Sequence, residues 1–431
     1  MPRQPVPLRP LLITLALACA TPALQADTLP EVVRLALAHD PQVRSARALW
    51  QATQAQTRQV RSRWWPSAGV NAQVGQADVT DLNRDLNRRT ERAEAYVRLN
   101  VYNGGADQAL LQSTEQEQQA ARLDLSRALQ EAAQQTAQAY VDAQRQQGIL
   151  TLAQQRLRDV QKLATDVDRL VSSGKSPESD RHAAQASLAD AQAAHDAAVV
   201  DATLTRRRLQ TLVGAPVGDL QAVELPDLSV DQALSIPPGA AQARNPAWLA
   251  AQARASSARL KLGPIQPELL PKVDLEWRQL LSERTTPTPS SGQQKGWTLS
   301  IGYDLPLGGG SFAKRDEGLA RAAAADGDTE RIARTIDLDL DNALQTLHRS
   351  RQLAPIYQRQ IRHLEAVVSA STLQYAAGRR DLIDLISLRE APFNISQRLI
   401  DNDSQGQKAA LAYWTLTGQL LSVLGLSSLE P

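Results

Sequence analysis

The sequence contains one unit written twice, and this duplication restricts the chain to a fold built from two similar halves. Four landmarks recur in the same order: "HDPQVRSARA" with "RNPAWLAAQARA", "RWWPS" with "ELLPK", "VYNGGA" with "PLGGGS", and "SSGKSPESD" with "AAGRRDLID". The spacing is 205 residues for the first three pairs and 204 for the fourth. Internal self-similarity of this kind indicates a supersecondary unit that is built more than once. We therefore predict a first structural repeat over residues 27–214, a linker over 215–228, a second repeat over 229–425 and a tail over 426–431.

Each repeat contains the same parts in the same order. A helical stretch interrupted at Asp-Pro or Asn-Pro ends at a proline, and two short alternating runs follow it. A very long helix, a glycine turn and a return helix come next, and we expect the return helices to end at Gly214 and Gly425. The first long helix is predicted from Ala106 to Ser173, 68 residues with no proline and a single glycine. At 1.5 Å per residue it would be roughly 100 Å long, so we predict an elongated molecule.

The alternating runs predict four short strands, two in each repeat. Each run is about as long as a transmembrane strand of roughly 9 to 11 residues, with one face suited to lipid and the other to a polar lumen. An ordinary soluble hairpin is the alternative. Trp64, Trp65 and Trp297 at the run ends favour a membrane, because tryptophan concentrates at membrane interfaces. The apolar positions are Val70, Ala72 and Val74, Val97, Leu99 and Val101, Val273, Leu275 and Trp277, and Trp297, Leu299 and Ile301.

The predicted strand number also constrains the assembly. The smallest membrane barrels have about eight strands, and an open sheet edge is not tolerated in lipid. Four strands per chain therefore predict an oligomer. The expected fold class is mainly α with a small β part.

The N-terminus predicts export. Residues 1–26 combine two arginines, an apolar run from Leu11 to Ala18 and small residues before Asp27, the pattern of a secretory signal peptide. The single cysteine, Cys19, lies in this segment, so it is either removed with it or serves as a lipid attachment site. Beyond this segment, no apolar run approaches the roughly 18 residues of a membrane helix. With 47 basic and 46 acidic residues, the chain has no electrostatic footprint for nucleic acid.

Catalytic interpretations of the first glycine turn, "LVSSGKSPESD", fail on spacing. A phosphate-binding loop needs a glycine where Arg169 stands, and the Ser172-x-x-Lys175 match lacks the companion motifs of serine hydrolases. A helix-ending Gly174 followed by a helix-starting Pro177 explains the stretch better. No cofactor is predicted, and no metal site, because the five histidines show no metal-binding spacing.

In this order and written twice, the motifs resemble the TolC-like family of bacterial outer-membrane efflux and type I secretion channels. The resemblance covers the Asp-Pro and Asn-Pro breaks, the "YNGG" and "LGGG" glycines, and above all "YAAGRRDLIDLISLREAPFNISQRL". It implies a homotrimer whose long antiparallel α-helical hairpins form an α-barrel across the periplasm and whose strands form a twelve-stranded transmembrane β-barrel in outer-membrane lipid. It also implies docking to a periplasmic adaptor, or membrane fusion protein, and to an inner-membrane transporter of RND or ABC type.

The resemblance further implies that the hairpin turns at Gly174 and Gly378 close the periplasmic tip. An aspartate after the first turn restrains a tyrosine and an arginine flanking the second turn; here these are Asp180, Tyr375 and Arg380. Acidic residues after the second turn ring the pore, which places Asp384 in the ring. This sequence departs from the family prototype at Ser387, where a second ring aspartate would stand.

Two function classes remain open at this stage. The first is a passive exit duct of an efflux or protein secretion system, gated at its periplasmic tip. The second is a periplasmic coiled-coil adaptor or scaffold, which would also need long antiparallel helices. An enzyme is disfavoured, because no clustered set of nucleophile, base or metal ligands is evident in the sequence. The sequence does not identify the cargo.

Overall fold

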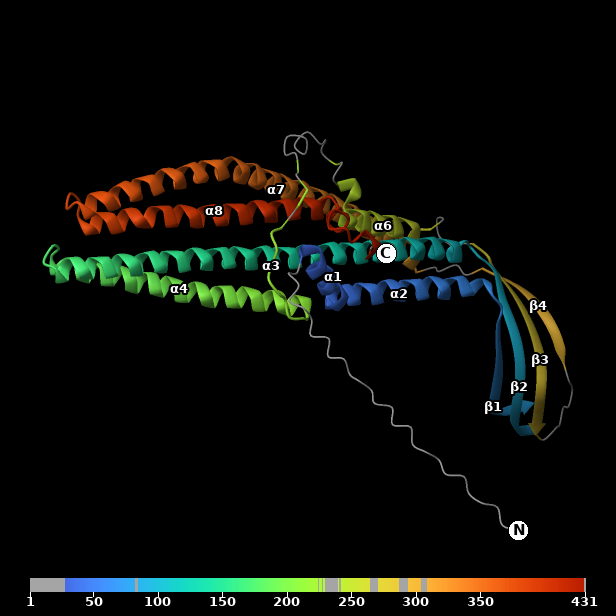
Figure 1. Cartoon of the computed structure of the whole chain (residues 1–431). Helices are drawn as coiled ribbons and strands as arrows, with labels where there is room; N and C mark the ends of the chain where they lie inside the picture. Colours follow the sequence, from blue (N-terminus) through green and yellow to red (C-terminus); the bar gives the residue numbers. More distant parts are fainter. Residues whose placement is uncertain are drawn as a thin grey trace, which may run out of the picture.

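The computed structural model of the chain describes residues 28–81, 84–223, 225–226, 228, 239, 242–263, 270–286, 294–303 and 308–429. Two long helical hairpins lie side by side at one end of an elongated molecule, and a curved sheet lies at the other (Figure 1). The shorter helices lie along the middle. The predicted signal peptide and Cys19 fall outside the described residues, as does part of the predicted linker.

The long helices confirm the elongated rods predicted from the sequence. Helix α3 runs Ala106–Ser172 and α7 runs Gly310–Ala376, 67 residues each. Their return partners are α4, Glu178–Val213, and α8, Leu382–Leu416. A 67-residue helix spans roughly 100 Å. Reciprocal hydrogen bonds of 2.9 Å between Ser350 and Asn402 join α7 to α8 along this length.

The Asp-Pro and Asn-Pro motifs act as helix caps at equivalent places in the two repeats. Asp40 separates α1, Leu29–His39, from α2, Pro41–Arg61, and its carboxylate accepts the Val43 N–H at 2.9 Å. In the second repeat, Asn245 follows the short 3-10 helix η2, Gln242–Arg244, and precedes α6, Pro246–Lys261; it accepts the Ala247 N–H at 2.8 Å. Proline at the first helical position needs no N–H partner and has a helical φ already.

The predicted end of the second return helix is wrong. Helix α8 ends at Leu416 and is followed by Gly418, at φ +68°, which matches the role of Gly214, at φ +72°, after α4. Gly425 instead follows the four-residue helix α9, Leu420–Val423, which precedes the 3-10 helix η4, Ser427–Leu429. The second copy offers two glycines where the first offers one, and the nearer of the two, Gly418, follows the helix end.

The strands form one antiparallel sheet in the order β1-β2-β3-β4. Three of them are longer than predicted: β1 spans Ser67–Asp81, β2 Arg84–Asn103 and β3 Lys272–Thr286, after the 3-10 helix η1, Ser62–Trp64. Strand β4, Lys295–Gly302, has 8 residues. Most of the polar stretch expected to separate β1 and β2 belongs to these strands, and pairing continues to Asp81 opposite Arg84. Polar side chains do not end a strand when the backbone ladder continues.

The two faces of the sheet differ in chemistry as the alternation predicted. One face carries exposed apolar side chains, among them Val70 at 71% and Ile301 at 71% exposure. The other face holds cross-strand polar pairs, such as Arg98 with Glu276 and Asn100 with Asp274, both at 2.8 Å. Because successive side chains of a strand point to opposite faces, a single sheet can present lipid-compatible and lumen-compatible surfaces.

The tryptophans in and next to the sheet lie in the half of it that adjoins the helices. Ala68, Val97, Trp277 and Trp297 lie in one row across the four strands. Trp65 precedes this row by three residues and is 75% exposed, while Trp297 is 73% exposed. The assignment of Trp64, Trp65 and Trp297 to a membrane interface stays a prediction.

The main hydrophobic core lies at the middle of the molecule, not at either end. It joins α1 to the central part of α3, the last turns of α4, and α9; its largest fully buried side chains include Tyr140, Leu129, Leu209 and Leu420. The Tyr140 hydroxyl donates a hydrogen bond to the Gln221 carbonyl at 2.8 Å, which satisfies the buried group. None of the helices in the described part of the chain combines the length and apolar character that crossing a membrane requires.

Candidate functional site at the helical tip

Both hairpins turn at the same end of the molecule, which we call the tip (Figure 1). Gly174 has φ +71° and Gly378 has φ +68°, the left-handed conformation that glycine adopts most easily. In the first turn the Lys175 N–H bonds the Leu170 carbonyl at 2.9 Å, and in the second Arg379 bonds Gln374 at 2.9 Å. These are Schellman caps, which satisfy the last carbonyls of α3 and α7.

A small hydrophobic cluster packs the second hairpin against the first just behind the turns. Leu163 and Val167 of α3 contact Leu382 and Leu385 of α8, together with Ala184 of α4. Helices α3 and α8 run antiparallel along this contact, so the tip of one hairpin is held beside the tip of the other. Burial of each such leucine contributes about 1.5–3 kcal/mol.

The three predicted restraint residues lie at the tip but do not bond one another within the chain. Asp180 accepts the Ser176 hydroxyl at 2.5 Å, and Arg380 donates to Ser371 Oγ at 2.7 Å and to Gln374 Oε1 at 3.3 Å. The Tyr375 hydroxyl is buried and has no hydrogen-bond partner among the described residues of this chain. Buried polar groups are nearly always satisfied, so this hydroxyl is an exception among the described residues.

The predicted ring residue lies on the exposed side of the first turn of α8. Asp384 is exposed, and so are its neighbour Ile383 and the Ser387 that replaces a second ring aspartate. The Ser387 hydroxyl donates a hydrogen bond to the Ile383 carbonyl of the same helix at 2.9 Å. Within the described ranges, no group of three or more histidine, cysteine, aspartate or glutamate side chains is placed to hold a metal ion.

The paired rods, the sheet and the duplicated plan can be compared with known proteins. The sequence profile of the outer membrane efflux protein family matches residues 32–215 and 238–419, which is most of the chain and includes both repeats. The chain belongs to the outer membrane efflux protein family. A search of curated protein sequences gave no significant match.

Solved structures share the fold of this efflux protein at low identity. The CmeC outer membrane channel of Campylobacter jejuni is 13% identical, with 91% of this chain and 86% of that chain covered and a TM-score of 0.78. The outer membrane protein VceC of Vibrio cholerae is 17% identical, with 90% and 96% covered and a TM-score of 0.79. The open state of the MtrE channel of Neisseria gonorrhoeae is 17% identical, with 91% and 89% covered and a TM-score of 0.75.

Family and fold together confirm the architecture predicted from the sequence. The efflux protein is mainly α-helical and internally duplicated, with long antiparallel hairpins and four strands per chain. The twelve-stranded barrel of a trimer stays a prediction. It is an outer-membrane efflux channel that extends into the periplasm. The tip described above is the end of the helical hairpins farthest from the sheet (Figure 1).

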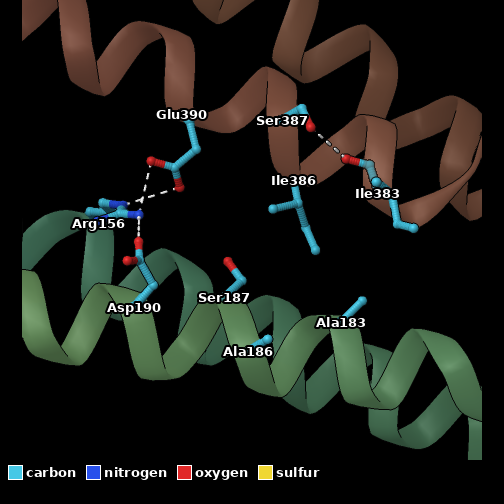
Figure 2. A pocket seen from close by; sticks show the side chains of 9 residues that line it. All are labelled: Arg156, Ala183, Ala186, Ser187, Asp190, Ile383, Ile386, Ser387 and Glu390. Atoms are coloured by element: carbon cyan, nitrogen blue, oxygen red, sulfur yellow. Dashed lines mark hydrogen bonds and ion pairs between the residues drawn. The ribbon is translucent and has the colours of Figure 1, made fainter.

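One charged cluster of the efflux protein was not predicted from the sequence. Arg156 of α3 bonds Asp190 of α4 at 2.5 Å and Glu390 of α8 at 2.9 Å, and its guanidinium lies 4.9 Å from the Phe393 ring centroid. Figure 2 shows Arg156 between the two carboxylates, which come from different hairpins. Burial lowers the pKa of Arg156, but its hydrogen bonds to Asp190 and Glu390 outweigh burial and leave the pKa raised. Only the antiparallel pairing of α3 with α8 could have revealed this cluster.

Proposed function

We propose that this outer-membrane efflux channel is the exit duct of a tripartite efflux pump or of a type I protein secretion system, and that it is gated at its periplasmic tip. The observation that carries the proposal is the convergence of two capped hairpin turns at one end of rods roughly 100 Å long. Three chains arranged about one axis would bring six such turns together, and a pore that narrows there can be closed by small movements of α8.

Asp180, Tyr375 and Arg380 form the restraint of this gate. The unsatisfied Tyr375 hydroxyl and the half-buried Arg380 lie beside the second turn, and the Asp180 carboxylate lies beside the first. Because the three do not bond one another within a chain, the restraint would form when hairpins of the trimer pack together. Charge-assisted hydrogen bonds of this kind contribute about 1.5–3 kcal/mol each, and threefold symmetry repeats them.

The partners follow from the same geometry. The duct would dock a periplasmic adaptor around the tip and receive cargo from an inner-membrane transporter of RND or ABC type. The duct supplies a path, while choice of cargo rests largely with the transporter. The matched family is that of outer membrane efflux proteins, which disfavours an adaptor or scaffold role.

Asp384→Asn tests the pore directly. Three exposed carboxylates around a narrow mouth add their negative potentials and favour cations, as acidic rings do in other cation-selective pores. In planar bilayers the wild-type channel should be cation-selective and blocked by a trivalent cation added on the periplasmic side. Asp384→Asn should reduce the selectivity and weaken the block at least several-fold. With Ser387 in place of a second acidic residue, only one ring contributes.

The matched control is Asp381→Asn, which neutralises the exposed N-cap residue one turn earlier on the same hairpin. This variant should leave block by the trivalent cation at the wild-type level. Unchanged block in the Asp384→Asn channel would show that Asp384 faces a helix interface or an adaptor instead of the pore.

A further inference from the structure

The Arg156 cluster lies at a position where it can control the tip. Arg156 is 18 residues before Gly174 on α3, which places it roughly 27 Å from the turn. Its side chain is only 11% exposed, and Glu390 is 30% exposed. The cluster therefore joins the two hairpins of one chain through a largely buried, charge-assisted contact, the strong class of hydrogen bond.

Among the described residues, three ion pairs join α3 to α8, and the Arg156–Glu390 pair is the closest of them to the tip. The other two are Arg145 with Asp401, at 3.3 Å, and Asp142 with Lys408. Both lie nearer the central core and are more exposed than Arg156. Movement of the tip about that core would displace α8 most at the Arg156–Glu390 pair and least at the other two.

On the tip side of the cluster, a gap open to solvent lies beside the close packing of Leu163 and Val167 of α3 against α8. A cavity of about 380 Å³ separates α4 from α8 there, lined by the small Ala183, Ala186 and Ser187 on one side and by Ile383, Ile386 and Ser387 on the other. Arg156, Asp190 and Glu390 close one end of this cavity (Figure 2). The gap faces α4, so α8 meets α4 little there, whereas α8 contacts α3 through the buried leucine cluster and through the Arg156–Glu390 pair. Separation of α8 from the first hairpin would break both of these contacts.

The second carboxylate explains how such a contact could break and re-form. Asp190 belongs to α4, in the same hairpin as Arg156, whereas Glu390 belongs to the other hairpin. If α8 moved away, Arg156 would keep Asp190 as its partner. Asp190, whose side chain is 71% exposed, would keep the Arg156 guanidinium paired in that state. The two acids therefore have different roles.

We propose that the Arg156–Glu390 pair is a latch that holds the second hairpin against the first in the closed channel and breaks when the tip opens, with Asp190 holding the released Arg156. The latch is distinct from the tip restraint of Asp180, Tyr375 and Arg380, but it rests on the proposed gate. Arg389, beside Glu390 on α8, also interacts with negative charges on α3. Burial lowers the pKa of Arg389, and the charges of Asp159 and Asp166 partly offset that effect.

Two substitutions with opposite expected effects on the open-state occupancy test the latch in planar-bilayer recordings of the full-length trimer. Glu390→Gln removes the ion pair that is present only in the closed state, so the open-state occupancy should rise about tenfold. Asp190→Asn removes the partner that Arg156 keeps in the open state, so the open-state occupancy should fall below that of the wild type. Asp401→Asn is the matched control, because it neutralises the Arg145 pair nearer the core, and it should behave as wild type.

The tip variant Arg380→Ser with Tyr375→Phe, recorded in parallel, separates the two proposals. If the tip variant opens more often than the wild type but Glu390→Gln does not, the latch is overturned and the proposed gate still holds. Wild-type behaviour in both overturns the gate and the latch with it. Activation by Asp401→Asn as strong as by Glu390→Gln would also overturn the latch, since position along α8 would then not matter. If Glu390→Gln does not assemble, Glu390→Asp, which shortens the side chain by one methylene, should give an intermediate occupancy, and wild-type occupancy there would overturn the latch.

Discussion

Channels that carry both Arg380→Ser and Tyr375→Phe should conduct several-fold more current than the wild type. Arg380 loses its guanidinium and Tyr375 loses the buried hydroxyl that has no partner within its own chain. Charge-assisted hydrogen bonds contribute about 1.5–3 kcal/mol each. The loss of two such groups in each of three chains therefore exceeds the few kcal/mol by which a closed state is typically favoured over an open one. Single-channel conductance in planar bilayers measures the effect.

Trimer stability should be unchanged in this variant. The Phe ring keeps the apolar contacts that Tyr375 makes with the tip cluster of Leu163, Val167 and Leu385. Arg379→Ser is the control, because Arg379 stands beside Arg380 in the same turn but is exposed. Wild-type conductance in the double variant, with trimers intact, would show that Tyr375 and Arg380 do not hold the gate.

Gly418→Ala should destabilise the channel more than substitution of any other capping glycine considered above. Gly418 has φ +68°, and a Cβ there would lie 2.6 Å from the backbone carbonyl oxygen of Arg244, which cannot swing away as a side chain can. Strain in the left-handed region costs about 1–3 kcal/mol, and the clash adds to it. The site joins the end of α8 to the start of α6, where Asn245 also bonds the Leu416 carbonyl at 2.8 Å.

Gly425→Ala is the matched control for this prediction. Gly425 has φ +72°, but a Cβ there meets nothing within 4 Å, so only the backbone strain remains. Helical circular dichroism followed during heating should show a large drop in the unfolding temperature for Gly418→Ala and a small one for Gly425→Ala. Equal drops would mean that the contact with Arg244 yields at little cost.

The parts of the fold that the sequence predicted well are those marked by local chemistry. Glycine and proline end helices for reasons that act within a few residues, so the long helix from Ala106 was placed to within one residue of its observed end at Ser172. The caps at Asp40 and Asn245 were located for the same reason. The lengths of β1, β2 and β3 exceed the prediction, because hydropathy marks which residues suit lipid, whereas the backbone ladder continues beyond them.

The candidate site was predictable only in part. Its positions near Gly174 and Gly378 follow from turn chemistry and from family resemblance. The Tyr375 hydroxyl has no hydrogen-bond partner among the described residues, so no pattern along the sequence could supply one. The Arg156–Glu390 pair joins residues more than 200 positions apart, and its detection requires the register between α3 and α8, which only tertiary packing sets.

Disulfide cross-linking of Asp384→Cys tests most directly whether three chains converge and close at the tip. The mature chain is expected to contain no other thiol, because Cys19 lies in the predicted signal peptide. Arg169→Cys, on an exposed side chain of the first hairpin, is the control. A disulfide forms only when the two Cα atoms are within about 7 Å. Mild oxidation should therefore produce disulfide-linked dimers from Asp384→Cys trimers and none from the control. Trimers of Asp384→Cys that yield no linked dimers would contradict a tip closed around this residue.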